Sequence, residues 1–207
     1  VRPSSEERIR KASPPGWQPS ADLMRFLESG PPPIYIGFGS MSDEDPERLT
    51  RLTLRALEHT EQRGVLATGW GGVKQLTPST QVFFLDHAPH DWLFSRMAAV
   101  VHHGGAGTTG AGLRAGAPSI ITPFTLDQYA WADVVAKLGV GPRAGDMRKL
   151  TTKKLARAIS VAVNDSAIRA RAAALGKTIR AENGVARAIE IIEGHAAEFK
   201  QRSRLNN

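Results

Sequence analysis

The chain has 207 residues, of which 41% are hydrophobic, so it is long enough to bury a core, and it contains no cysteine. Disulfide bonds and thiolate-bound metal ions are therefore excluded, and no apolar run approaches the roughly 20 residues that a membrane-spanning helix needs. The formal charge of +7 comes from the C-terminal third: residues from Arg143 onward carry 14 lysines and arginines against 6 acidic residues.

This basic region has a single aromatic residue, Phe199. Nucleic-acid-binding surfaces usually combine positive charge with a recognised module or interleaved aromatic residues. We therefore expect a solvated helical face here and no nucleic-acid partner. Peripheral contact with an anionic membrane surface, or with another protein, is the alternative.

The first 33 residues are rich in proline and predict a linker with one short helix around Leu23–Leu27. A buried strand is predicted from Ile34, ending in Gly39-Ser40. The helix that follows begins well, because Asp45 is a suitable cap and Pro46 occupies the first helical position. We expect it to continue to about Thr60.

The rest of the chain alternates apolar runs with helical patterns. Strands are predicted at 65–68, 81–85, 100–102 and 119–122, with a further short strand near 140–142, and helices at about 90–97, 106–115, 127–138, 151–163, 166–182 and 184–200. Alternation of this kind predicts an α/β domain, here with a Rossmann-like parallel sheet of about six strands flanked by helices and a helical C-terminal tail.

Polar residues follow several of the predicted strands, namely Ser40, His87, His103 and Asp127. Ligands of parallel α/β sheets bind at the carboxyl ends of the strands. We therefore expect one crevice to hold all four residues.

The most informative stretch is HHGGAGTT, residues 102–109, which joins a predicted strand to a predicted helix. A glycine-rich turn lets backbone N–H groups converge on an anion, and the N-terminus of the helix favours negative charge. Here the turn also supplies an imidazole and two hydroxyls. This combination suits a diphosphate whose negative charge grows as it leaves.

The same stretch matches G-x-G-x-x-G at residues 105–110, the dinucleotide-binding fingerprint, and leaves an NAD-type oxidoreductase domain as an alternative. That fingerprint normally follows the first strand of its unit, with its acidic residue at the end of the next strand. In this chain at least three strands come first, and Asp127 lies beyond Pro123 and is joined to Gln128. These differences count against a dehydrogenase.

Adjacent side chains on a strand point to opposite faces, so only one of His102 and His103 reaches the ligand. We assign His103, next to the glycines, to the ligand, and we expect no metal site because the two imidazoles diverge. Asp127 and Gln128 together suit vicinal hydroxyls, although Asp127 is also a plain helix cap in the simpler alternative. Trp70 suits either a stacked base or the edge of the core.

These motifs together resemble the C-terminal, donor-binding lobe of glycosyltransferase family 1, which has the two-lobed GT-B fold. The resemblance is strongest to the sterol 3-beta-glucosyltransferase group and related bacterial natural-product glycosyltransferases. It rests on the segments 33–41, 88–94 and 100–109, and on Pro123-Phe124 with Asp127-Gln128. It covers residues from about Gly30 to Gly141.

The resemblance implies a role for each matching residue. The diphosphate of a UDP-sugar would be held by Gly39, Ser40, His103, Gly105, Gly107 and Thr108. The sugar hydroxyls would be held by Asp127 and Gln128, and the nucleoside would lie by Trp70, His87 and Ala88. The chain departs from plant members at His87 and Ala111, where they have Trp and Glu, and from sterol glucosyltransferases at Thr125-Leu126, where an aromatic-Gly pair is common.

The resemblance also implies that the acceptor pocket and the catalytic base lie on an N-terminal lobe that this chain lacks. An acceptor hydroxyl would attack the anomeric carbon with inversion while UDP departs, stabilised by His103, with no cofactor or metal required. The predicted organisation is an interlobe linker at 1–33, a donor-binding domain at 34–183 and a final helix at 184–207 that leans toward the missing lobe.

Three hypotheses follow from this organisation. The chain is the donor lobe of a longer enzyme, or a natural half-enzyme that binds an acceptor lobe in trans, or a dinucleotide-binding module. Under the first two we expect a hexosyltransferase that is inactive as the isolated chain, cytoplasmic and peripheral at the membrane. Glucose is only weakly favoured over other sugars, and UDP over TDP.

Overall fold

The structure is a computed structural model that describes residues 16–39, 46–68 and 80–205. Its centre is a five-stranded parallel sheet in the order β3-β2-β1-β4-β5. The strands are β1 (Ile34–Gly37), β2 (Gly64–Ala67), β3 (Val82–Leu85), β4 (Ala99–His102) and β5 (Ser119–Ile121). This arrangement confirms the predicted Rossmann-like α/β architecture.

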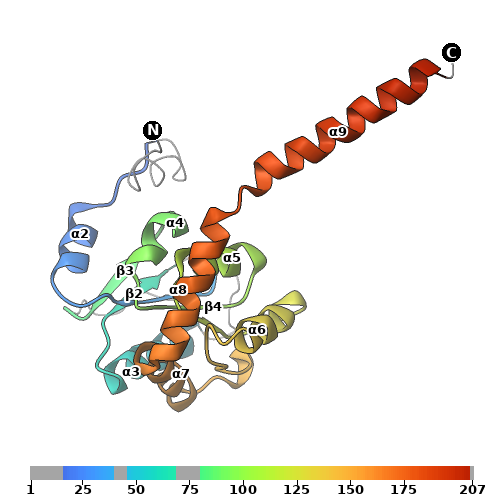
Figure 1. Ribbon diagram of the computed structural model, residues 1–207. Helices are drawn as coiled ribbons and strands as arrows, with labels where there is room; N and C mark the ends of the chain where they lie inside the picture. The colour runs from blue at the N-terminus through green and yellow to red at the C-terminus, as the bar shows by residue number, and fades with distance from the viewer. Residues whose placement is uncertain (1–15, 40–45, 69–79, 206–207) are drawn as a thin grey trace.

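Helices connect the strands and cover the sheet (Figure 1). They are α2 (Ala21–Glu28), α3 (Pro46–His59), α4 (His90–Leu93), α5 (Ala106–Ala115), α6 (Asp127–Lys137), α7 (Thr152–Asn164), α8 (Ser166–Ala181) and α9 (Gly184–Leu205), with 3₁₀ turns η1 (Phe94–Arg96) and η2 (Met147–Lys149). Figure 1 shows α9 extending away from the sheet and its covering helices. Within the described ranges, no helix is both long and apolar enough to cross a membrane.

Both faces of the sheet are buried, as expected when parallel strands are covered on two sides. In β1, Ile34 and Ile36 belong to a core shared with α3 and α7, whereas Tyr35 belongs to a second core. In β4, Val101 faces the first core and Val100 the second. The period-2 alternation of a strand therefore separates the two cores.

The predicted sixth strand near 140–142 is wrong. Instead, Ser119 N–H donates to the Val140 carbonyl at 3.1 Å, and Arg143 makes an isolated bridge with Ile121. Pro142 has no N–H to donate, so a continuous ladder beside β5 cannot form there. β5 is therefore the edge strand of the sheet, and these two contacts join it to the segment 140–143.

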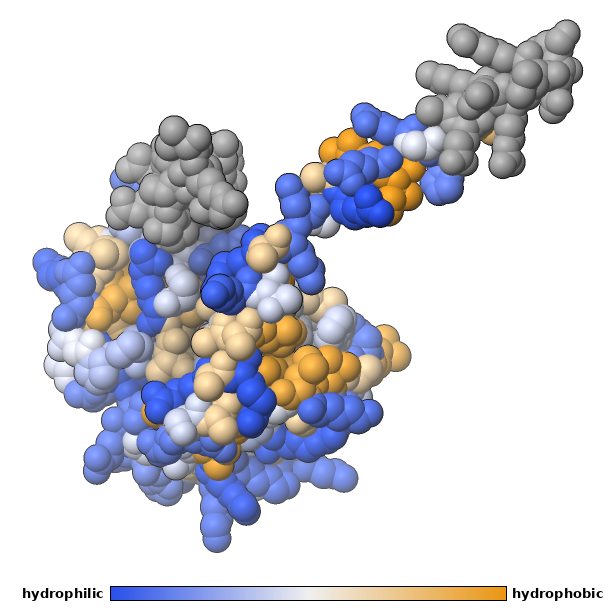
Figure 2. All heavy atoms as spheres, in the orientation of Figure 1, coloured by the Kyte–Doolittle hydropathy of each residue, from blue (hydrophilic) through white to orange (hydrophobic). Residues whose placement is uncertain are grey.

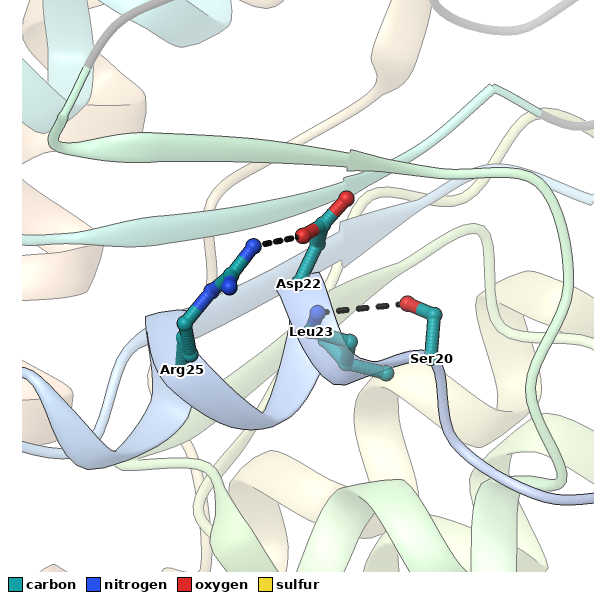
Figure 3. A network of polar contacts seen from close by, with 4 residues as sticks. All are labelled: Ser20, Asp22, Leu23 and Arg25. Carbon is teal, nitrogen blue, oxygen red and sulfur yellow. Dashed lines mark hydrogen bonds and ion pairs between the residues drawn. The ribbon is translucent and has the colours of Figure 1, made fainter.

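The proline-rich N-terminal part contains the predicted short helix, α2, whose Leu23 is buried in the second core. Ser20 begins this helix, because its Oγ accepts a hydrogen bond from Leu23 N–H at 3.2 Å. Figure 3 shows this cap beside the surface pair of Asp22 and Arg25. The described part of the segment thus packs on the domain.

Candidate functional site

The carboxyl ends of β1 and β4 meet at a topological switch point. The two strands are neighbours, with Gly37 opposite His102, yet β2 and β3 lie on one side of them and β5 on the other. The chain therefore leaves β1 and β4 in opposite directions, and such a switch point is where ligands of open α/β sheets bind. The residues that follow these strands, Gly39 and His103, lie at this edge.

Two glycines enclose the His103 ring. A Cβ atom added to Gly39, which has a φ of +64°, would lie 3.1 Å from His103 Cε1, and one added to Gly105 would lie 2.5 Å from His103 Nε2. A side chain at either position would therefore displace the ring. This proximity gives a physical reason for glycine at two of the predicted diphosphate residues.

Helix α5 begins directly beyond His103. Gly105 is its N-cap and has no side chain to bond the first turn, while Thr109 donates from both N–H and Oγ1 to the Gly105 carbonyl at 2.9 and 3.0 Å. A Cβ added to Gly107 would meet no atom of the described residues within 4 Å. The first-turn N–H groups, beside a half-buried Thr108, can therefore receive an anion.

His102 is fully buried and supports the turn from within. Its Nδ1 accepts the backbone N–H of Gly104 at 3.1 Å, where Gly104 has a φ of +95°. Burial, followed by the charges of His103 and His90, lowers the pKa of His102 to about 3. The imidazole is therefore neutral at ordinary pH and serves as an acceptor. His103, which is half-buried, is therefore the more accessible imidazole of the pair.

His103 is half-buried, and burial lowers its pKa while the Asp127 carboxylate raises it. Its Nδ1 is buried and has no hydrogen-bond partner among the described residues. A buried polar atom without a partner is uncommon and is often a mark of a functional position. The opposing effect of Asp127 also indicates that the carboxylate and the imidazole share one electrostatic environment.

Asp127 and Gln128 open helix α6 close to the glycine turn. A Cβ added to Gly104 would lie 3.2 Å from the Gln128 backbone oxygen, so the two segments are packed together. Asp127 is exposed, whereas Gln128 is buried and its Oε1 accepts N–H bonds from Phe124 at 2.7 Å and Thr125 at 3.1 Å. Only the amide nitrogen of Gln128 is left for a sugar.

The predicted nucleoside residues His87 and Ala88 follow β3, which is separated from β4 by β2 and β1. His87 is exposed and Ala88 is buried. Sequence reasoning missed their neighbour His90, whose ring stacks on that of Phe94 with the ring centres 4.4 Å apart. Burial lowers the pKa of His90, and so do the charges of His87 and His103. Ser40 and Trp70 lie outside the described residues.

A cavity of about 490 Å³ lies away from this edge, between the end of α3 and α7, and none of the predicted site residues lines it. Among the residues that the structure describes, no cluster of three His, Asp or Glu side chains could hold a metal ion. The candidate site is therefore the switch-point edge itself, with an imidazole, a helix N-terminus and a carboxylate as its polar groups.

Residues 72–193 match the family of C-terminal domains like that of erythromycin biosynthesis protein CIII. The chain belongs to this family. Its relatives include sterol 3-beta-glucosyltransferase UGT80A2 of Arabidopsis thaliana, with 44% identity over 89% of this chain, and sterol 3-beta-glucosyltransferase of Aspergillus terreus, with 41% identity over 85%. The matches span only 29% and 13% of those relatives' lengths.

Solved structures share the fold. The glycotransferase of kitacinnamycin matches 86% of this chain with a TM-score of 0.67, and the calicheamicin glycosyltransferase CalG4 matches 89% with a TM-score of 0.69, each at 24% identity. The matches cover 44% and 46% of those chains. As predicted, this EryCIII-like domain has the fold of one lobe of a GT-B glycosyltransferase.

The site of this EryCIII-like domain is suited to stabilising a leaving anion. N–H donors at the start of α5 and the imidazole of His103 converge at one edge, where growing negative charge would find preorganised dipoles. Asp127 provides hydrogen-bond acceptors on the adjoining helix. The described residues at this edge therefore offer groups for binding and for charge stabilisation.

Proposed function

We propose that this chain binds the nucleotide-sugar donor of an inverting glycosyltransferase, with UDP-glucose as the donor. The acceptor would be a hydroxyl group of a sterol-like lipid or a natural product. The observation that carries this proposal is the His103 ring, enclosed by Gly39 and Gly105 at the N-terminus of α5. The names of the relatives and of the structural neighbours support the same class of reaction.

In the proposed reaction, the acceptor oxygen forms a bond to the anomeric carbon as the bond from that carbon to the diphosphate oxygen breaks. The bonding electron pair leaves with UDP. His103 and the first-turn N–H groups of α5 would stabilise the developing charge, in place of a metal ion. Asp127 and the Gln128 amide would orient the sugar hydroxyls. The acceptor proton would pass to a base on another lobe.

The second lobe is part of the proposal because the chain spans less than half of the kitacinnamycin glycotransferase and of CalG4. It would be joined in cis or bound in trans, as a natural half-enzyme would require. Helix α9 supports this view. Its exposed apolar residues include Val185, Ile189, Ile192 and Phe199, and Figure 2 shows hydrophobic atoms along the helix where it stands clear of the domain.

We also propose that the protein works in the cytoplasm, in peripheral contact with a membrane that holds a lipid-like acceptor. Helix α7 carries Lys153, Lys154 and Arg157, and α7 contains no acidic residue. Lys153, Lys154 and Arg157 are exposed. This basic surface would favour an anionic bilayer, with each cation near the surface contributing about 1 kcal/mol.

The proposal is tested by titrating the chain calorimetrically with UDP, UDP-glucose, TDP-glucose and NAD. We expect UDP and UDP-glucose to bind and NAD not to bind. His103→Ala should lower the affinity for UDP and for UDP-glucose. His59→Ala removes an exposed imidazole at the far end of α3 and should change neither affinity. Binding of NAD alone would favour a dinucleotide-binding module. Binding of no nucleotide would contradict a donor site in this chain.

A further inference from the structure

Leu126 has an unusual backbone conformation, with φ of 45° and ψ of −124°. Residues other than glycine rarely adopt this region, because the Cβ atom meets the backbone. Strained residues of this kind persist only where the surrounding structure holds them, and they gather at functional sites. Leu126 directly precedes Asp127, at the predicted sugar-binding edge.

The loop around Leu126 is held from several sides. The Gln128 side chain binds the N–H groups of Phe124 and Thr125, and Gln128 N–H donates to the Thr125 carbonyl at 3.1 Å. On the outer side, the Arg148 guanidinium lies 4.3 Å from the centre of the Phe124 ring. Leu126 therefore cannot relax without breaking contacts on both of its flanks.

The Leu126 side chain makes no packing contact with the described residues of the domain that would offset this strain. It is 85% exposed, more than any other large hydrophobic side chain in the described part of the chain. A glycine would suit the backbone better, and an exposed leucine adds no packing to the core. The side chain is therefore available for contacts outside the domain, next to Asp127, whose carboxylate raises the pKa of His103.

We infer that Leu126 is a specificity-determining residue that packs against the apolar C–H face of the donor hexose. This inference rests on the proposed function. A hexose ring presents hydroxyls at its rim and C–H groups on its face, so a carboxylate and an adjacent aliphatic side chain can contact the two parts together. Asp127 would hold the rim and Leu126 the face. The diphosphate and nucleoside would not touch Leu126.

The test uses two substitutions that both remove the side chain. Leu126→Gly also relieves the backbone strain, whereas Leu126→Ala keeps it. Leu138→Ala, at the other end of α6, is the matched control, because Leu138 is also exposed. Calorimetric affinities for UDP and for UDP-glucose are measured on each variant, and thermal unfolding is followed in parallel.

Loss of a buried aliphatic contact should lower the affinity for UDP-glucose about tenfold in both Leu126 variants. The affinity for UDP should be unchanged in both. Leu138→Ala should change the affinity for neither ligand. Leu126→Gly should also unfold at a higher temperature than Leu126→Ala. Unchanged UDP-glucose affinity in both variants would overturn the inference. So would weakening in Leu126→Gly alone, or equal weakening of UDP and UDP-glucose. Failure of the unaltered chain to bind either ligand would instead reject the proposed function itself.

Discussion

The Nδ1 atom of His102 accepts the backbone N–H of Gly104 at 3.1 Å, two residues further along the chain. This bond holds a turn in which Gly104 has a positive φ and in which His103 and Gly105 approach each other. The buried imidazole thus supports the groups that would receive the diphosphate, without contacting the ligand. His102 is a positioning residue, and its protonation state is fixed by burial.

His102→Leu should lower the free energy of unfolding by about 1–3 kcal/mol, because it leaves the Gly104 N–H buried without an acceptor. It should also weaken UDP, since the turn that presents the N–H groups is no longer held. His102→Asn places a carbonyl oxygen near the lost Nδ1 and should recover part of both losses. Denaturant unfolding and calorimetric titration measure the two effects. Equal losses in the two variants would contradict a role for the acceptor atom.

The same histidine should make stability depend on pH. Its pKa of about 3 in the folded chain lies below the ordinary value of 6.5, so the unfolded chain binds a proton that the folded chain does not. The contribution is fully present above pH 6.5 and is lost as pH falls toward 3. Between these values His102→Asn should reduce the slope of unfolding free energy against pH by about 1.4 kcal/mol per pH unit. An unchanged slope would show that His102 is protonated in the folded chain.

Gly105 and Gly110, both in the α5 region, allow a matched test of the His103 enclosure. In Gly105→Ala the new methyl group would lie 2.5 Å from His103 Nε2, whereas at Gly110 it would meet no described atom within 4 Å. Gly105→Ala should therefore displace the ring and weaken UDP, with little backbone strain because φ is −59°. Gly110→Ala should leave UDP affinity unchanged and stabilise the helix by about 0.5–1 kcal/mol. Equal UDP affinity in both variants would argue against the enclosure.

Binding of UDP-glucose should depend on pH through His103. Burial lowers the pKa of the free imidazole, and a bound diphosphate would raise it by favouring the charged form. Affinity should therefore increase as pH falls through the pKa of the complex. UDP-glucose is the ligand of choice, because its diphosphate has no terminal phosphate group to titrate. His103→Asn should flatten the dependence of UDP-glucose affinity on pH, measured from pH 8 to pH 5.5. An identical pH dependence in this variant would show that another group is responsible for it.

Much of the candidate site could be predicted, because the residue types in its motifs indicate their chemistry directly. A glycine-rich run after an apolar strand indicates an anion-binding turn, and the structure brings His103, Gly105 and Asp127 to one edge as expected. Gly39 lies beside His103 because β1 and β4 are neighbouring parallel strands. These predictions depend on local sequence and on a rule for where parallel strands end.

Other features depend on contacts that a single sequence does not reveal. The assignment of Gln128 to the sugar gives no sign that its Oε1 also accepts the N–H groups of Phe124 and Thr125. The conformation of Leu126 has no signal in the residue type, because leucine rarely adopts a positive φ. The run at 140–142 is an exception, because the proline at position 142, which cannot donate to the ladder, is visible in the sequence.

Arg63 fastens the N-terminal segment to the domain, and its removal should loosen α2 selectively. The buried guanidinium donates to the Pro31 carbonyl and to Ser29 Oγ, each at 2.9 Å, and to the Phe26 carbonyl, while it lies 4.2 Å from the Phe26 ring centre. Arg63→Ala should cost about 1–3 kcal/mol of unfolding free energy, because carbonyls lose their donors. Amide hydrogen exchange should accelerate in α2 more than in α7. Arg55→Ala, an exposed control on α3, should change neither. Uniform acceleration across both helices would show that Arg63 supports the whole domain rather than this segment.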